Sequence, residues 1–564
     1  MKRIASIFCC LVFLASCKKK DDVAAEPLPP EVADSTFTIS SVIKTDLNEV
    51  DIKYLAKPPA SQNFSEISLN WSTSVDFSQD KDSAAVTVTG SGAQTFSLKG
   101  LKQATKYYGR VSALYNGKRI FSAIKEWLTD TLKIVNIGYG TPPWAFNKGD
   151  SFIVVRTNLP SNLPTTSINT RIFIGPYECI FVRDEGTNIF FHIPATMPSG
   201  KYLLELRRKG ATAFSPDSMS ILSGRWTNLT PPVLPLNPAA ATSGLFSFGT
   251  CQSAQKGYML GGAFFNGLGS GPETMNMGFL LEFNPVNRQW TRRNPPVSRF
   301  FEDPVCYYYN NGIYIIGGRQ RVWDASGNDR YRMIKKMLRL DLTSLAWSEL
   351  DSMPVYGNYY TTSFELGNEW YIGMGSDSAN LSVCCGVPLP SKKFFKYNPS
   401  TNQWNRLADF PGAHQVFPTC FSIGAKGYAF YGGIPIGDPV TAINFLQELW
   451  EYDPSSNSWK KIALPVSGGP PQGEKYQVVV YNGKAYFITT QKNSLGCCFY
   501  YMALQNVCLE WDPVTNIYKR VAYPQNGEVM KLIYGQNNQF VFQSEALGAF
   551  ERIPNRTFLF DINQ

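Results

Sequence analysis

The 564-residue sequence predicts an all-β protein in which two β-sandwiches precede a closed ring of six four-stranded sheets. Three observations predict this fold. A seven-residue turn motif recurs along the C-terminal half, its last copy stops before the aromatic residue that ends every other copy, and short stretches of alternating apolar and polar residues fill most of the N-terminal half. A period of two is the pattern of strands that bury one face.

The turn motif runs from Asn284 to Trp290 and places an aromatic residue six positions after Asn or Asp. These residues favour turns because their short side chains accept hydrogen bonds from the backbone that follows, and a Pro at the next position pre-sets φ. Successive aromatic residues are 57, 57, 55 and 59 positions apart. The further copies are Asp341 to Trp347, Asn398 to Trp404, Asp453 to Trp459 and Asp512 to Tyr518.

A pair of small residues, preceded by a short apolar strand, lies 26 to 29 positions before most of these aromatic residues. The arrangement resembles the kelch repeat, and a period near 50 residues with four short strands per unit is typical of a β-propeller blade. The fifth unit departs from the pattern, with Thr489-Thr490 and Tyr518 in place of the glycines and the Trp. The pairs are Gly261-Gly262, Gly317-Gly318, Gly373-Met374-Gly375 and Gly432-Gly433.

The repeat count predicts a six-bladed kelch-type propeller over residues 223–564. Five units are complete, and a sixth copy of the motif begins at Asp561 without an aromatic residue after it. A spare Trp stands ahead of the first unit, at Trp226. We expect the strand around Trp226 to complete the sixth blade, because joining the two ends of a ring covers an otherwise exposed sheet edge.

The first 35 residues carry the features of an exported protein. Two basic residues, an apolar run and Cys17 predict a signal peptide over residues 1–16, in a segment too short to span a membrane. The segment resembles a bacterial lipoprotein signal, which implies a lipid-modified Cys17, and the basic and then acidic cluster that follows is similar to the surface-export signal of Bacteroidetes lipoproteins. We expect residues 17–35 to form a tether, with the lipid as the only membrane contact, at the outer membrane and facing the cell exterior.

Two immunoglobulin-like sandwiches are expected between the tether and the ring. Residues 36–130 resemble a fibronectin type III domain, with Tyr107 at the position whose hydroxyl bonds to upstream backbone. Residues 131–222 resemble an IPT/TIG domain, on the motifs around Ile172, Phe190 and Tyr202. The resemblance implies that the two domains act as a spacer and a neck below the propeller.

Composition argues against several classes of function. The formal charge of +9 over 564 residues forms no basic stripe, so we expect no nucleic-acid partner. His192 and His414 are the only two histidines, and a zinc or copper centre normally draws on several His or closely spaced Cys ligands. We therefore expect no metal and no cofactor. A copper radical oxidase, a chemistry found on a kelch-like propeller, would need two propeller histidines, whereas this propeller offers His414 alone.

Nine of the 12 cysteines remain after the signal peptide and Cys17 are set aside, so they cannot all be paired with one another. Cys251, Cys306 and Cys420 fall at comparable places on innermost strands and are expected to be small buried residues. The adjacent pairs at Cys384 and Cys497 allow disulfides across loops or between neighbours, and their connectivity stays open.

A ligand is expected on the face of the ring that carries the long loops. In each blade, the loop between the second and third strands and the connection to the next blade share one face, while tight turns occupy the other. Long loops on a rigid scaffold are where binding sites are usually built. The residues expected to contact a ligand there are Arg299, Glu302, Asp303, Trp323, Tyr359, His414, Glu474, Lys475 and Glu528.

The sequence leaves three classes of function open. The favoured hypothesis is a cell-surface lipoprotein that presents the propeller on a two-domain stalk to bind a glycan or protein at the long-loop face. A second hypothesis is a carbohydrate-active enzyme resembling the six-bladed kelch mutarotase that acts on sialic acid through a carboxylate and an Arg. No catalytic residue can be matched for it, so an enzymatic role is less favoured. A third is a structural subunit of an outer-membrane complex.

Overall fold

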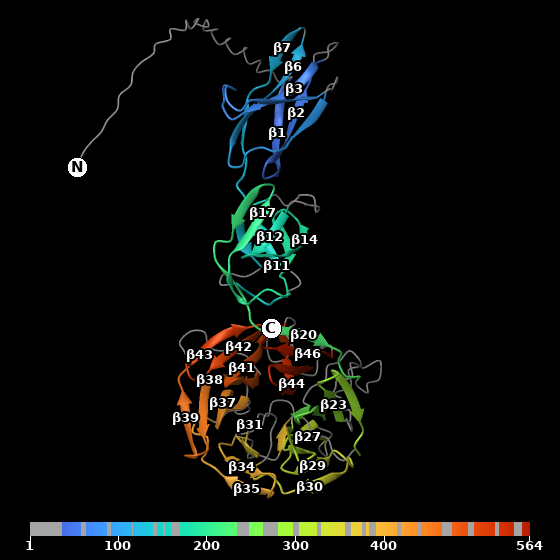
Figure 1. The fold of residues 1–564 in the computed structure, drawn as a ribbon, viewed down its shortest axis with the longest axis vertical. Helices are drawn as coiled ribbons and strands as arrows, with labels where there is room; N and C mark the ends of the chain where they lie inside the picture. The colour runs from blue at the N-terminus through green and yellow to red at the C-terminus, as the bar shows by residue number, and fades with distance from the viewer. Residues whose placement is uncertain are drawn as a thin grey trace, which may run out of the picture.

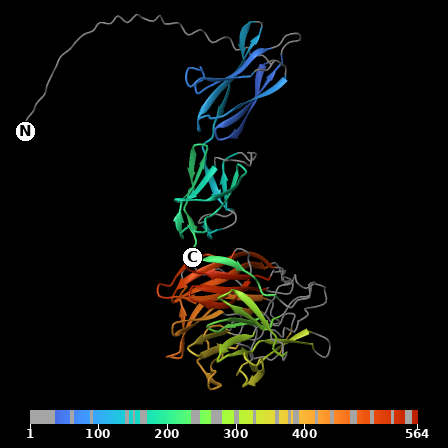
Figure 2. The same ribbon diagram turned by 45° about the vertical axis from the view of Figure 1, so that its right-hand side comes forward.

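A computed structural model describes residues 37–57, 64–86, 92–115, 117–138, 144–149, 153–159, 170–233, 248–262, 280–296, 304–323, 329–355, 362–374, 380–382, 391–413, 419–436, 442–464, 476–494, 501–524, 529–545 and 555–564. The described residues form strands and turns without any α-helix. Accordingly, no helix long and apolar enough to cross a membrane is found among them. The two sandwiches and the ring lie in a row (Figures 1 and 2). The predicted all-β architecture is confirmed.

The first sandwich packs a three-stranded sheet, ordered β1-β2-β5, against a five-stranded sheet in which β4, β3, β6 and β7 are neighbours and β8 also pairs with β6. The alternating residues Val50, Ile52 and Tyr54 are fully buried between them. The Tyr107 hydroxyl accepts a hydrogen bond from the backbone N–H of Lys102 at 2.9 Å, as expected. The strands are β1 (Phe37–Asp46), β2 (Glu49–Ala56), β3 (Ser65–Ser72), β4 (Asp82–Val86), β5 (Gly92–Leu98), β6 (Lys106–Tyr115), β7 (Lys118–Phe121) and β8 (Lys125–Leu128).

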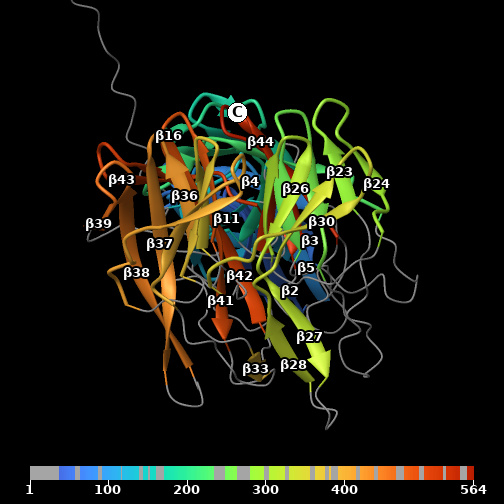
Figure 3. The same cartoon turned by 90° about the horizontal axis from the view of Figure 1, so that it is seen from below.

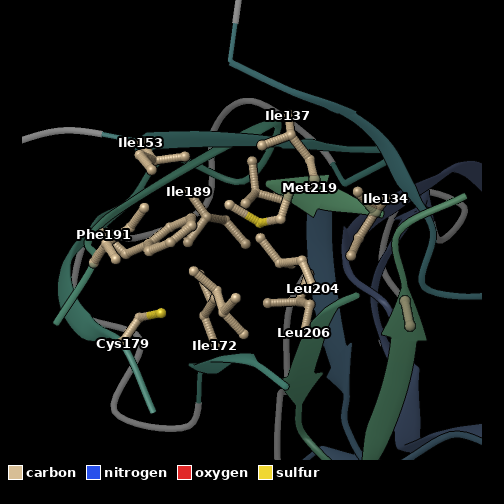
Figure 4. Packing of buried hydrophobic residues seen from close by; sticks show 14 of the residues in the cluster. Ile134, Ile137, Ile153, Ile172, Cys179, Ile189, Phe191, Leu204, Leu206 and Met219 are labelled. Atoms are coloured by element: carbon tan, nitrogen blue, oxygen red, sulfur yellow. The ribbon is translucent and has the colours of Figure 1, made fainter. Parts of the chain in front are cut away.

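The second sandwich has two four-stranded sheets, ordered β14-β15-β11-β9 and β13-β12-β17-β18, and a small sheet ordered β10-β19-β16. Figure 4 shows Ile172, Phe191 and Leu206 pointing into the space between the sheets, where all three are buried. The strands are β9 (Ile134–Ile137), β10 (Ala145–Phe146), β11 (Ile153–Thr157), β12 (Thr170–Ile174), β13 (Tyr177–Glu178), β14 (Ile180–Asp184), β15 (Asn188–His192), β16 (Gly200–Tyr202), β17 (Leu204–Arg208), β18 (Ala211–Phe214) and β19 (Met219–Ile221).

The C-terminal part is a ring of six four-stranded antiparallel sheets, which confirms the predicted six blades. The first five blades are built from consecutive chain segments, and a small additional sheet is inserted between strands of the second and third blades. Their strands are β21 (Gly249–Gln252), β22 (Gly257–Leu260), β23 (Leu280–Asn284) and β24 (Gln289–Arg293); β25 (Val305–Tyr309), β26 (Gly312–Ile316), β29 (Met337–Asp341) and β30 (Trp347–Leu350); β31 (Thr362–Leu366), β32 (Glu369–Gly373), β34 (Phe394–Asn398) and β35 (Gln403–Arg406); β36 (Thr419–Ile423), β37 (Lys426–Ile436), β38 (Ala442–Asp453) and β39 (Ser458–Ile462); and β40 (Tyr476–Tyr481), β41 (Lys484–Ser494), β42 (Tyr501–Asp512) and β43 (Ile517–Val521).

The sixth blade joins the two ends of the propeller sequence. Its strands are β44 (Val529–Gln536), β45 (Gln539–Glu545), β46 (Thr557–Asp561) and β20 (Arg225–Leu229), and β20 pairs with β46 in antiparallel register. The Trp226 ring stacks on Phe560 at 4.5 Å between centroids. Gly224 has φ +86° and a Cβ there would lie 2.6 Å from the Phe560 ring, so only glycine fits where the chain enters this strand.

The repeated turn has a fixed conformation. The Asn284 Oδ1 accepts the N–H of Val286 at 2.9 Å, and Asp453 and Asp512 accept in the same way from the residue two positions later. The residue before the last two motif positions has a positive φ in all five copies, between 47° and 58°. Asn tolerates this left-handed conformation better than other non-glycine residues, which accounts for Asn402, Asn457 and Asn516 there.

In three blades a Trp of the outermost strand links the blade to the preceding one. Trp347 Nε1 donates to the Pro296 carbonyl at 2.9 Å, and Trp459 Nε1 donates to the Ala408 carbonyl at 3.3 Å. Trp226 completes the series by donating to the Ala522 carbonyl at 2.8 Å. In the second, fourth and sixth blades the outermost strand is therefore fastened to the segment that leaves the preceding blade, whereas the buried Nε1 atoms of Trp290 and Trp404 make no hydrogen bond within the described residues.

Candidate functional site

Several of the expected long loops extend the blades as β-hairpins. β37 and β38 stay paired to Ile436 and Ala442, and β41 and β42 to Ser494 and Tyr501, so segments expected to be loops are strands. The glycine pair at Gly432 did not end its strand, because the chain absorbs it as a register shift between Phe430 and Gly432. These paired strands lengthen and stiffen the blades on that side of the ring.

The second and third blades are bridged by a three-stranded sheet. β27 (Arg319–Trp323) and β28 (Asp329–Met333) form a hairpin, and β33 (Asn380–Ser382), inserted in the third blade, pairs with β28. Figure 3 shows this sheet and the β37–β38 and β41–β42 hairpins extending in the same direction from the ring. We call the side that they form the hairpin face.

Of the residues expected to bind ligand, the backbone of Trp323 is described. It is the last residue of β27 and pairs with Asp329, which places it on the hairpin face. The remaining expected contacts and the expected lipidation site lie outside the described residues and stay predictions. They are Cys17, Arg299, Glu302, Asp303, Tyr359, His414, Glu474, Lys475 and Glu528.

The first strands of the blades surround the axis of the ring. Neighbouring first strands contact one another, as β21 does with β25 and with β44. They carry polar side chains that are half-buried or exposed although the strands lie at the centre: Cys251, Tyr307, Ser363, Glu365, Cys420 and Lys531. We call this set the axial cluster.

Glu365 is the carboxylate of the axial cluster. Its side chain is accessible to solvent, yet burial by the surrounding protein raises its pKa above the usual value. Desolvation disfavours the charged form of a carboxyl group and so raises its pKa. A carboxyl group held in this way can carry a proton closer to neutral pH than a surface glutamate can, which suits an acid-base role.

The thiols and the lysine near the axis can take part in fewer kinds of chemistry than Glu365. Burial raises the pKa of the Cys306 thiol to about 12 and the pKa of the Cys251 thiol well above its usual value. Both thiols therefore stay protonated at neutral pH and are poor nucleophiles and metal ligands. Lys531 donates from Nζ to the Phe248 carbonyl and lies 5.1 Å from the centroid of that ring, which fixes a positive charge at the seam between the sixth and first blades.

The described residues contain no group of three or more His, Cys, Asp or Glu side chains placed to hold a metal ion. His192 is half-buried in β15 of the second sandwich, away from the ring. The cysteine pairs at Cys384 and Cys497 lie outside the described residues. Cys251, Cys306 and Cys420 have reduced thiols on first strands; Cys306 is buried, as expected, whereas Cys251 and Cys420 are only half-buried.

Sequence reasoning missed Glu365 and Tyr307. Tyr307 lies on β25 and Glu365 on β31, the first strands of their blades. The repeat positions in the sequence could have identified both as residues of first strands. The sequence could not predict that the two side chains lie near each other, because their proximity depends on closure of the ring. Burial raises the pKa of Tyr307, so its hydroxyl is a hydrogen-bond donor at neutral pH.

No protein-family model matches the sequence. One segment of 124 residues is 26% identical to an N-acetylneuraminate epimerase of Pasteurella multocida (strain Pm70), covering 22% of this chain and 28% of that protein. An N-acetylneuraminate epimerase of Yersinia enterocolitica (serotype O:8 / biotype 1B, strain NCTC 13174 / 8081) is 26% identical over 110 residues, or 20% and 25% of the two chains. The chain thus spans about a quarter of the length of the curated relatives it matches.

Two solved structures are also similar. The structure of YjhT aligns at a TM-score of 0.40 and 15% identity, over 58% of this chain and 95% of that one. A Bacteroides thetaiotaomicron protein of unknown function aligns at a TM-score of 0.33 and 10% identity, over 77% and 98%. Both scores are low, so the assignment of a kelch-like β-propeller rests on the repeats and on the six sheets themselves.

Proposed function

We propose that this protein is a cell-surface lipoprotein that holds its propeller on a two-domain stalk and binds an extracellular glycan or protein at the hairpin face. The observation that carries the proposal is the common direction of the strand extensions from at least four blades of one closed ring (Figure 3). Strand pairing holds these extensions in place, and binding sites on rigid elements are better defined than those on free loops.

The opposite face of the ring offers little for recognition. Its described turns are short and repeat the same Asn or Asp conformation from blade to blade, with Val286 and Val514 each 92% exposed at their tips. Short turns of one repeated kind offer less variety of polar groups than ligand sites usually have. Trp323, at the end of β27, is the one predicted contact whose backbone the structure places on the hairpin face, and Arg299 and Glu474 stay predicted contacts for the same ligand.

The binding proposal is tested with the full chain carrying Cys17→Ser, which removes the expected lipid. In detergent phase separation this variant should partition into the aqueous phase, because a diacyl anchor is the only strong membrane attachment that the sequence predicts. The purified protein is then applied to a glycan array and to surface extracts. Retention of the variant in the detergent phase contradicts the anchor, and absence of binding in both assays contradicts the binding function.

Glu365 favours a second candidate, a carbohydrate-active enzyme. The support is a solvent-accessible carboxyl group with a raised pKa at the centre of the ring, together with the local similarity to N-acetylneuraminate epimerases. The test is an anomerisation assay on N-acetylneuraminate with the native chain and with Glu365→Gln. A fall in activity of at least about 100-fold in the variant supports acid-base catalysis by Glu365. Equal activity in both chains would mean that Glu365 is not the catalytic group.

A further inference from the structure

The two junctions between the three domains are made of buried polar contacts. At the first junction, Asp46, Asp184 and Arg208 are 4%, 0% and 2% exposed. Asp46 ends β1 of the first sandwich, whereas Arg208 ends β17 and Asp184 ends β14 of the second. Charges are almost never buried this deeply unless they are paired and hydrogen-bonded. This cluster therefore depends on a fixed position of one sandwich against the other.

Arg208 joins the two domains by directional contacts. Its Nε and Nη2 donate to the two oxygens of Asp46 at 3.3 and 3.2 Å, in the bidentate arrangement that guanidinium and carboxylate groups favour. Its Nη1 contacts the Asp184 carboxylate and donates to the Thr170 hydroxyl at 3.1 Å. A swing of one sandwich would leave a buried charge without a partner, which is strongly unfavourable.

Further contacts surround this ion cluster. Lys209, next in the chain, reaches Asp46 and Glu49 of the first sandwich, at 2.6 Å each. Leu47 lies in the turn between β1 and β2, yet its 1% exposed side chain belongs to the hydrophobic core of the second sandwich. The first sandwich thus supplies a residue to the hydrophobic core of the second. The first junction therefore combines a buried ion pair, a second cation and an apolar anchor.

The second junction fastens the second sandwich to the ring. Asn147 is 7% exposed; its Nδ2 donates to the Tyr523 carbonyl and its Oδ1 accepts the Tyr523 N–H at 3.1 Å. The Asn147 side-chain amide thus pairs with the backbone N–H and carbonyl of Tyr523, as a neighbouring strand would, in the segment that leaves the fifth blade. The Ala522 N–H donates to the Ser223 carbonyl at 2.7 Å, and Leu222 belongs to a core cluster of the fifth and sixth blades.

We infer that the two junctions lock the sandwiches and the propeller into one rigid arm, which fixes the direction of the hairpin face relative to the first sandwich. The arm holds the propeller in one orientation. Residues 37–564 then behave as one body in solution, unlike ordinary multidomain chains, in which relative domain motion is the default. This inference concerns the stalk and stands whether or not the ligand proposal is correct.

The first junction is tested by pulsed electron paramagnetic resonance on the full chain carrying Cys17→Ser. Spin-labelled amino acids replace the exposed residues Thr95 and Thr212 without use of the native thiols. We expect one narrow distance distribution, broadened at least about twofold by Asp46→Asn and also by Lys209→Ala, which leaves the buried Arg208 pairs intact. Asp80→Asn is the control, because it breaks the exposed pair between Lys102 and Asp80 within the first sandwich.

The second junction is tested with labels at Thr212 and Thr291, exposed positions on the second sandwich and the first blade. Asn147→Ala should broaden the distribution. Asn158→Ala is the matched control, because it removes two comparable side-chain bonds, to Lys133 and Thr131, and spares the ring. A broad distribution in the unsubstituted chain overturns the rigid arm, as do widths that stay unchanged when the junction residues are replaced.

Discussion

At the scale of single residues, Glu365 and Asp46 are two carboxyl groups whose pKa values are shifted in opposite directions. Burial raises the pKa of Glu365 and nothing that bonds to it reverses the direction. Burial also acts to raise the pKa of Asp46, but hydrogen bonds from Lys209, Arg208 and the Leu47 N–H lower it overall. Stability should therefore respond to pH in opposite senses at the two sites.

Replacing Glu365 with Gln should raise the melting temperature at pH 8. A carboxyl group whose folded pKa is raised contributes stability below its unfolded pKa, near 4.3, and loses that contribution as pH rises through the folded pKa. The neutral amide avoids the cost of ionising a partly desolvated carboxyl group. Melts of the native and variant chains should converge at about pH 4. A variant that is less stable at pH 8 would mean that the ionised carboxylate has a favourable partner.

Replacing Asp46 with Asn should destabilise the first junction at neutral pH by roughly 3–5 kcal/mol, the range for breaking a buried ion pair. The folded pKa of Asp46 is lowered, so its contribution is present above about pH 4 and is lost as pH falls through the folded value. The charged groups facing it are Lys209, Arg208 and, beyond these, Glu49 and Asp184. Native stability should fall more steeply in acid than that of Asp46→Asn, as followed by chemical denaturation at several pH values. Parallel pH profiles would contradict this.

At the scale of elements, the outer edge of each blade depends on its motif aromatic residue. Trp459 contacts Phe394, Phe410 and Tyr452, with ring centroids 5.0 to 5.2 Å apart. Trp459→Ala should cost roughly 3–5 kcal/mol. Trp459→Phe keeps most of the packing and loses the bond to Ala408, for which about 1 kcal/mol is expected. Equal losses on denaturation of the two variants would show that the indole N–H, rather than packing, matters most.

The strand β20 closes the ring, and removing it should expose the edge of β46. A chain that begins at residue 223 should fold, and one that begins at residue 233 should aggregate or melt at a lower temperature. A chain that begins at residue 131 should melt highest of the three, because it keeps Asn147 and its bonds to Tyr523. Equal melting temperatures for the chains from 223 and 233 would exclude β20 as the closing strand.

The sequence was most informative where structure is local. The Asn or Asp turns and their aromatic residues could be predicted because the turn is determined by bonds within a few residues, such as that from Val286 to Asn284. The ion pair between Arg208 and Asp46 could not, because 162 positions separate the two residues and only domain docking brings them together. The hairpin extensions were missed for a third reason: a glycine pair marks a strand end in one blade and a bulge in another.

At the scale of the whole molecule, the chain is a row of three domains whose last member gathers strand extensions on one face (Figures 1 and 3). The stalk reaches the ring beside the fifth and sixth blades through Asn147 and Ser223. The bridging sheet instead belongs to the second and third blades, on other parts of the ring. Docking of the stalk therefore leaves the bridging sheet open to a partner.

The central claim is that the hairpin face binds the ligand, and the most direct measurement is the affinity of face-specific variants for a ligand identified on the array. Trp323→Ala alters the hairpin face, Arg299→Ala and Glu474→Ala remove two further predicted contacts, and Val286→Ser with Val514→Ser alters the exposed tips of the opposite turns. As a set, the first three should weaken binding at least about tenfold, or about 1.4 kcal/mol, while the valine variant binds as the native chain does. Unchanged affinity in the first three, with binding abolished by the valine substitutions, would place the functional surface on the opposite face.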